Sequence, residues 1–133
     1  MRVTAMDDGM TIFGTISLRK LIQRIETATP DGEVRFDFCG LTPSGIDSYR
    51  GYYDHLAIGW KDDSAVLVSD FLAMLRGAIG ATFTGWKGGD FVMDGDSPVW
   101  VANRGHTSDT AIVDVLVEGE ESKWVHIVTA RIP

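Results

Sequence analysis

Two segments of the chain repeat apolar residues at the spacing of one face of an α-helix. The first runs from Ser17, a typical N-cap residue, to about Ala28, and the turn sequence of residues 29–32 follows it. The second runs from Ser69, also expected to be an N-cap, to Gly80, a residue type that commonly ends helices. The apolar faces consist of Leu18, Leu21, Ile22 and Ile25 in the first segment and of Phe71, Leu72, Leu75 and Ile79 in the second. Both segments are therefore predicted to be amphipathic helices.

Several other segments are apolar or alternate apolar and polar residues, as strands do. We expect a loop over residues 40–45, and a turn at residues 119–122 that joins the last two strands in a hairpin. The expected strands are residues 33–38, 55–60, 91–93, 98–102, 110–118 and 123–132. Most of them follow one another closely, which favours antiparallel pairing. The sequence therefore predicts an α+β fold: an antiparallel sheet of about six strands with the two amphipathic helices packed on it.

Length and targeting signals set the organisation of the chain. No linker, low-complexity tract or internal repeat divides it, so residues 1–133 are expected to form a single domain. Residues 1–12 are expected to be a flexible leader, in which Met10 offers an alternative start. The N-terminus lacks the basic and apolar regions of a signal peptide, and no apolar run reaches 18 residues. We therefore expect a cytoplasmic protein that does not enter a membrane.

Charge and cysteine content exclude several classes of partner and site. The net charge of −7 argues against DNA or long RNA as a partner, because their phosphates require a basic surface. A small phosphorylated ligand held by two or three arginines remains compatible with this charge. Cys39 is the only cysteine, which rules out an internal disulfide and a zinc site built on several thiolates.

Residues suited to catalysis or metal binding are few. His55, His106 and His126 are far apart and have no recognisable metal or nucleophile spacing. Only His106 lies in a polar loop, where it could act in acid–base chemistry. The alternating aspartates of residues 90–96 lack the remainder of a calcium-binding loop. We therefore expect no metal, no cofactor and no enzymatic activity.

Two polar stretches have the composition of a binding site. Residues 47–54 contain three tyrosines and Arg50, and residues 82–91 surround Trp86 and Lys87 with glycines. Arginine suits phosphate, and an exposed aromatic side chain can stack on a base. Each stretch also has a simpler interpretation. The first could be a tyrosine-rich entry to a strand whose Arg50 pairs with a neighbouring aspartate, and the second a hairpin turn with Trp86 packed on the core.

The runs Val34–Phe38, Asp47–Tyr53 and Gly85–Phe91 resemble small phage proteins, and most of all the first type of Thoeris anti-defence protein. The resemblance covers roughly residues 17–105. It implies a non-enzymatic sponge that binds the cyclic ADP-ribose signals made by bacterial TIR-domain proteins. Some members of that family also hold the cyclic oligonucleotides of a neighbouring defence system. The resemblance further implies a homodimer or homohexamer in the host bacterial cytoplasm.

The same resemblance implies a pocket with a stacking aromatic, an amide side chain and arginines on the phosphates. The candidates are Phe91 or Trp86 for stacking, Asn103 for the amide, and Arg50 with Arg104 or Arg131 for the phosphates. Together with the polar stretches, the expected ligand-binding residues are Tyr49, Arg50, Tyr52, Trp86, Lys87, Phe91, Asn103, Arg104 and Arg131. Two alternatives stay open. One is an enzyme that degrades such a nucleotide through His106 and Asp109, and the other is an acidic inhibitor that binds a host defence protein.

Overall fold

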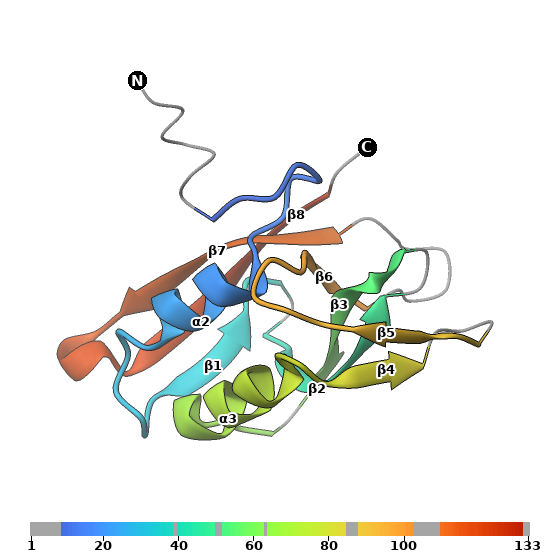
Figure 1. Ribbon diagram of the computed structural model, residues 1–133. Helices are drawn as coiled ribbons and strands as arrows, with labels where there is room; N and C mark the ends of the chain where they lie inside the picture. The colour runs from blue at the N-terminus through green and yellow to red at the C-terminus, as the bar shows by residue number, and fades with distance from the viewer. Residues whose placement is uncertain are drawn as a thin grey trace.

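The computed structural model describes residues 9–38, 40–49, 52–62, 64–84, 88–102 and 110–131, with Tyr52 and Tyr53 described by their backbone alone (Figure 1). Within these ranges the chain forms two α-helices, a six-stranded sheet and a separate two-stranded hairpin. The predicted α+β class is therefore confirmed.

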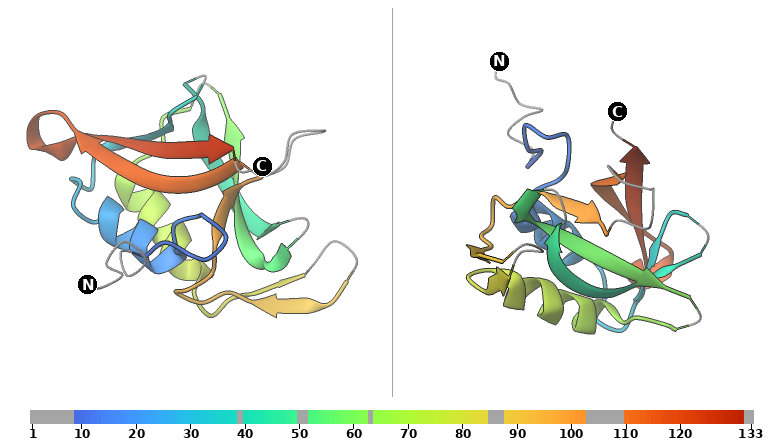
Figure 2. Two further views of the ribbon diagram at one scale, coloured as in Figure 1. Left: turned by 90° about the horizontal axis from the view of Figure 1, so that it is seen from above. Right: turned by 90° about the vertical axis from the view of Figure 1, so that its right-hand side faces the viewer.

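The six strands form one mixed sheet, curved until it is nearly closed into a barrel (Figure 2). Their order across the sheet is β1-β8-β7-β6-β3-β2. The bounds are Glu33–Phe36 for β1, Thr42–Tyr49 for β2, Tyr52–Lys61 for β3, Val99–Val101 for β6, Thr110–Glu118 for β7 and Trp124–Arg131 for β8. The two outer strands come together where the Phe36 N–H donates to the Leu41 carbonyl at 2.8 Å.

The expectation of an antiparallel sheet is only partly confirmed, because the sheet is mixed. β1 pairs with β8 in parallel, and β3 pairs with β6 in parallel, whereas the other neighbours are antiparallel. Proximity along the chain could not reveal these pairs. β6 follows β3 only after a helix and a hairpin, and such a crossover returns the chain in the same direction. β1 and β8 come from opposite ends of the sequence.

The barrel is built from two halves of the same topology. Each half is a helix followed by three strands, namely α2-β1-β2-β3 and α3-β6-β7-β8, with the β4–β5 hairpin inserted after α3. In each half, the last strand pairs in parallel with the first strand of the other half. This repeat is invisible in the amino-acid sequence. As a result, the carboxyl ends of β1, β3, β6 and β8 meet at one end of the barrel.

The helices differ in how they begin. α2 (Leu18–Ile25) begins as predicted, because the Ser17 hydroxyl accepts a hydrogen bond from the Lys20 N–H. α3 (Val68–Ala78) has Leu67 at its N-cap, so the prediction that Ser69 caps it is wrong. Tertiary contacts explain the earlier start: Val68 is buried, and its N–H donates to the Gly32 carbonyl at 2.8 Å. Gly80 follows the helix with a φ of +81°, as expected of a glycine that ends a helix.

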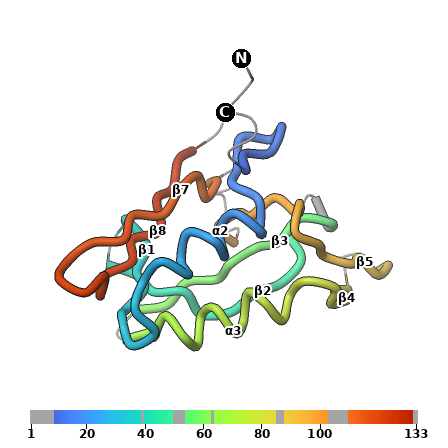
Figure 3. The backbone as a smooth tube through the Cα atoms, turned by 60° about the vertical axis from the view of Figure 1, so that its left-hand side comes forward, coloured from blue at the N-terminus to red at the C-terminus, as the bar shows by residue number. Residues whose placement is uncertain are grey.

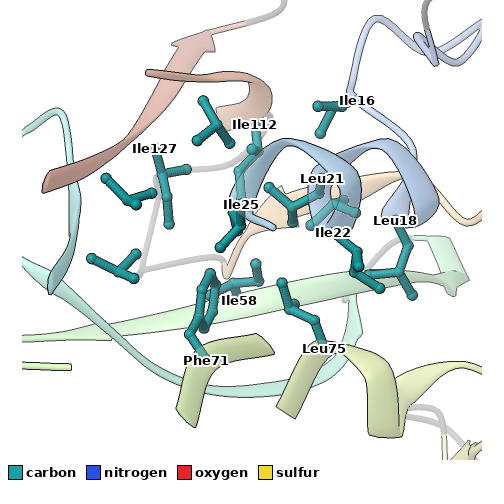
Figure 4. Packing of buried hydrophobic residues seen from close by; sticks show 14 of the residues in the cluster. Ile16, Leu18, Leu21, Ile22, Ile25, Ile58, Phe71, Leu75, Ile112 and Ile127 are labelled. Atoms are coloured by element: carbon teal, nitrogen blue, oxygen red, sulfur yellow. The ribbon is translucent and has the colours of Figure 1, made fainter. Parts of the chain in front are cut away.

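The apolar faces of both helices pack against the inward-facing side chains of the sheet and form the main core (Figure 4). The helices contribute Leu18, Leu21, Ile22, Ile25, Phe71, Leu72 and Leu75, and the strands contribute Ile58, Ile112, Ile127 and others. Burying one such side chain contributes about 1.5–3 kcal/mol. Ile79, which was expected on the apolar face of the second helix, follows the helix and is exposed.

Two features depart from or extend the expected strands. Residues 42–49 form β2, although their first part was expected to be a loop. Pro43 and Gly45 are accommodated because β2 is an outer strand with a register shift between Pro43 and Ile46. The hairpin of β4 (Thr82–Thr84) and β5 (Asp90–Val92) extends from the C-terminal end of α3 (Figure 3). The last hairpin, β7–β8, is confirmed.

Candidate functional site

The inward-facing rows of the sheet change character at the end where the four carboxyl ends meet. Along β3, Leu56 and Ile58 belong to the core, and the next inward position is Trp60. Along β8, Ile127 belongs to the core and Thr129 follows it. These positions open into a hollow of about 310 Å³, which we call the barrel mouth. The barrel mouth is lined by Phe38, Trp60, Val101, Ala102, Thr110, Thr129 and Arg131.

The barrel mouth combines an aromatic surface with a cation and two hydroxyl groups. Phe38 and Trp60 provide the aromatic surface, and both also pack against the core. The Arg131 guanidinium is exposed at the end of β8 and forms no ion pair with any described residue. An arginine side chain presents several donors that suit a phosphate or a carboxylate. The mouth can therefore hold a flat ring and an anionic group at the same time.

Of the predicted ligand-binding residues, Arg131 lines the barrel mouth. Asn103 and Arg104 lie outside the described residues. Ala102 and Thr110, which are described, both line the mouth. Arg50, Trp86, Lys87 and the Tyr52 side chain also lie outside the part of the chain that can be described.

The other two predicted residues lie elsewhere in the described structure. Tyr49 is 2% exposed, and its ring stacks on Trp100 with a centroid distance of 4.9 Å. Both belong to a small cluster on the outer side of the sheet, together with Ala57 and Ala111. Phe91 is half-buried on β5, in register with Phe83 of β4. In the described chain, neither Tyr49 nor Phe91 lines the barrel mouth.

A second hollow of about 660 Å³ lies between the start of α2 and the start of β3, and we call it the outer cavity. Arg19 and Lys20 bring two cations to its wall. Arg19 is held in place, because its Nη1 lies 2.6 Å from Asp96 Oδ1 and its guanidinium lies against Gly95. A Cβ at residue 95 would approach Arg19 Nη2 at 2.6 Å, so only glycine leaves room for this arrangement.

His55 forms part of the wall of the outer cavity and is buried. Its Nδ1 accepts a hydrogen bond from Trp100 Nε1 at 3.0 Å, which places the proton of the neutral ring on Nε2. Burial lowers the pKa of His55, although the nearby carboxylate of Asp54 acts in the opposite direction. Protonating Nδ1 would also break the bond to Trp100. His55 is therefore held as a neutral ring that fixes Trp100.

Sequence reasoning missed Phe38, Trp60 and Thr129 because each simply continues the pattern of a strand. The available signal was weak: Thr129 places a hydroxyl at an inward position, two residues after the buried Ile127. Trp86 was singled out because glycines surround it, whereas Trp60 is the last residue of the expected strand 55–60. These side chains can be recognised as one site only from the sheet topology, which brings the carboxyl ends of four strands together.

No family model matches the sequence, and no curated protein or solved structure matches it significantly. In the described part of the chain, no group of three or more histidine, cysteine, aspartate or glutamate side chains could hold a metal ion. No helix in the same ranges is long and apolar enough to cross a membrane.

Proposed function

We propose that this protein binds a cyclic nucleotide signal, in the first place an isomer of cyclic ADP-ribose, and sequesters it without cleaving it. The observation that carries the proposal is the barrel mouth, where Trp60 and Phe38 line the same hollow as the cation of Arg131. The resemblance to phage anti-defence sponges supports the same ligand class. In that role the protein would act in the cytoplasm of an infected bacterium.

The chemistry of the mouth suits a base attached to phosphate. A base stacked on an aromatic side chain gains about 1–3 kcal/mol. Arg131 can donate charge-assisted hydrogen bonds to a phosphate, and such bonds are stronger than neutral ones. The mouths of β-barrels are also frequent ligand sites. We therefore assign the base to Trp60 and the phosphate to Arg131.

The size of the mouth has a consequence for the oligomeric state of the protein. A volume of about 310 Å³ lies at the lower end of the usual range for ligand pockets, so the mouth encloses only part of a dinucleotide. A sponge must compete with the receptor for the signal, which requires binding near 1 nM, or about −12 kcal/mol. We propose that a second subunit covers the remainder of the ligand in a homodimer or homohexamer.

The outer cavity supports a second part of the proposal. It is about twice as large as the mouth, and Arg19 and Lys20 could contact two phosphates there. A cyclic oligonucleotide would fit this arrangement better than it would fit the mouth. The two ligands would then occupy separate sites on one chain.

Titration calorimetry with cyclic ADP-ribose isomers tests the assignment of the mouth. We expect Arg131→Ala to weaken binding by about 10-fold or more, since a hydrogen bond to a charged group is worth about 1.5–3 kcal/mol. Arg76→Ala is the matched control, because Arg76 is an exposed arginine on α3 that pairs with Glu26. Cyclic oligonucleotides should bind Arg131→Ala as well as they bind the unmodified protein. If Arg131→Ala and Arg76→Ala bind the ADP-ribose ligand equally, the mouth is not its site.

A further inference from the structure

Thr129 at the barrel mouth has a fixed hydrogen-bonding role. Its hydroxyl oxygen lies 2.6 Å from Asp37 Oδ1, and its backbone N–H donates to Asp37 Oδ2 at 2.9 Å. Asp37 is held in turn, because its own N–H donates to the Ile127 carbonyl at 2.9 Å. This bond continues the β1–β8 pairing and brings the carboxylate beside Thr129.

The direction of the Thr129–Asp37 bond follows from the chemistry of the two groups. A carboxylate has no proton to donate, so the Thr129 hydroxyl must be the donor. A hydroxyl has a single proton, and here that proton is committed to Asp37. The oxygen of Thr129 therefore has only lone pairs left to offer to a molecule in the mouth. By contrast, Arg131 can only donate.

We infer that the barrel mouth selects a base that carries an exocyclic amino group, and that Thr129 is the residue that reads it. The inference rests on the proposed function, because it assigns the group that the mouth recognises. An amino group such as N6 of adenine can donate a hydrogen bond to the Thr129 oxygen. A carbonyl oxygen at the same place would face the Thr129 oxygen as a second acceptor, and no hydrogen bond could form. Asp37 is the positioning residue, since it determines which way the hydroxyl points.

Adenosine 5′-monophosphate and inosine 5′-monophosphate provide the test, because they differ in the amino or carbonyl group at C6 and the neighbouring ring proton. The expected result is that the adenosine compound binds about 3- to 10-fold more tightly, the range set by one hydrogen bond. Purine riboside 5′-monophosphate, which has only hydrogen at C6, should bind with an intermediate affinity. Thr129→Val should reduce the preference to about one, and Thr129→Ser should restore it. Thr82→Val is the matched control and should leave the preference intact, because Thr82 is an exposed threonine on β4 that does not line the mouth.

Asp37→Ala separates a positioning role from a merely structural one. Without Asp37, the Thr129 hydroxyl can turn and donate to a carbonyl, so the inosine compound should gain affinity relative to the adenosine compound. A loss that is equal for both ligands would overturn the role of Asp37. Equal binding of both ligands to the unmodified protein would overturn the inference and leave nucleotide binding intact. If neither ligand binds at millimolar concentration, the inference is overturned, whereas the proposed function is tested separately by the titration with cyclic ADP-ribose isomers.

Discussion

At the end of β3, the inward-facing side chain is Trp60 where the preceding inward positions are aliphatic. This change matters because Trp60 and the Arg131 cation line the same hollow, an arrangement that core packing alone does not require. Trp60 is half-buried and packs against the core. It also lines the mouth. The residue thus serves both the packing of the barrel and the proposed stacking of a base.

Trp60→Ala should weaken binding of a cyclic ADP-ribose isomer by about 1–3 kcal/mol, which is about 5- to 150-fold. Trp60→Phe keeps a ring at the same place and should retain most of the affinity. Trp124→Ala serves as the control, because Trp124 is 43% exposed at the start of β8, away from the mouth. Calorimetry measures the affinities, and circular dichroism confirms that each variant is folded. Binding by Trp60→Ala within twofold of the unmodified protein would exclude stacking on this residue.

His55 provides a prediction about pH that is independent of ligand. Burial lowers its pKa in the folded state below the ordinary value of 6.5. Below pH 6.5 the unfolded chain therefore binds more protons at this residue than the folded chain does. The contribution of the neutral His55 to the free energy of unfolding is fully present above pH 6.5. It decreases as the pH falls from 6.5 toward the pKa of His55 in the folded state.

Thermal unfolding at pH values from 7.5 to 5.0 measures this effect. His55→Gln should be less stable at pH 7.5, because the bond between His55 and Trp100 is lost. Its melting temperature should then change less with pH than that of the unmodified protein. Parallel curves for the two proteins would show that His55 contributes nothing to the pH dependence.

At the scale of secondary-structure elements, Gly32 lies where β1, α3 and β8 come together. It precedes β1, its carbonyl accepts from the N–H of Val68 at the start of α3, and the Lys123 carbonyl next to β8 lies close by. A Cβ at Gly32 would approach Lys123 O at 2.7 Å and Thr29 O at 3.1 Å. Both are backbone atoms that cannot turn aside as a side chain can.

Gly32→Ala should therefore lower the free energy of unfolding by about 1–3 kcal/mol, as overpacking does. Gly77→Ala is the matched control, for which the opposite effect is expected. Gly77 is exposed in α3, and nothing lies within 4 Å of a Cβ added there. That variant should raise the free energy of unfolding by about 0.5–1 kcal/mol. Denaturant titration measures both. The packing described at Gly32 is wrong if its alanine variant is as stable as that of Gly77.

How well the elements could be predicted depended on how local their causes were. α2 was predicted with its cap because Ser17 and the apolar spacing act within the helix. β2 was missed because Pro43 and Gly45 have the composition of a turn, and only pairing with β3 makes them a strand. The start of α3 was misplaced because the bond from Val68 to Gly32 is a tertiary contact. For the candidate site, Arg131 was one of the arginines expected to contact a phosphate, and it lines the mouth, whereas Trp60 could be recognised only from the arrangement of the strands.

At the scale of the whole molecule, the two topological halves contribute different chemistry to the barrel mouth. The first half supplies the aromatic side chains Phe38 and Trp60. The second half supplies Thr110, Thr129 and Arg131. A barrel whose halves share one topology therefore has a mouth with an aromatic side and a polar side. Under the proposed function, the ring of the base would stack on the first half, and the second half would contact the amino group of the base and the phosphate.

The central claim is that the protein holds a cyclic nucleotide intact. The direct measurement is to incubate the purified protein with cyclic ADP-ribose isomers and with cyclic di- and trinucleotides, and to filter the mixture. Chromatography then measures each nucleotide in the filtrate of the untreated mixture and in the filtrate obtained after the protein has been denatured by heat. We predict that a cyclic ADP-ribose isomer disappears from the first filtrate and returns unchanged after heating. A nucleotide that returns altered would identify an enzyme, and nucleotides that all remain in the filtrate would contradict nucleotide binding and favour a protein partner.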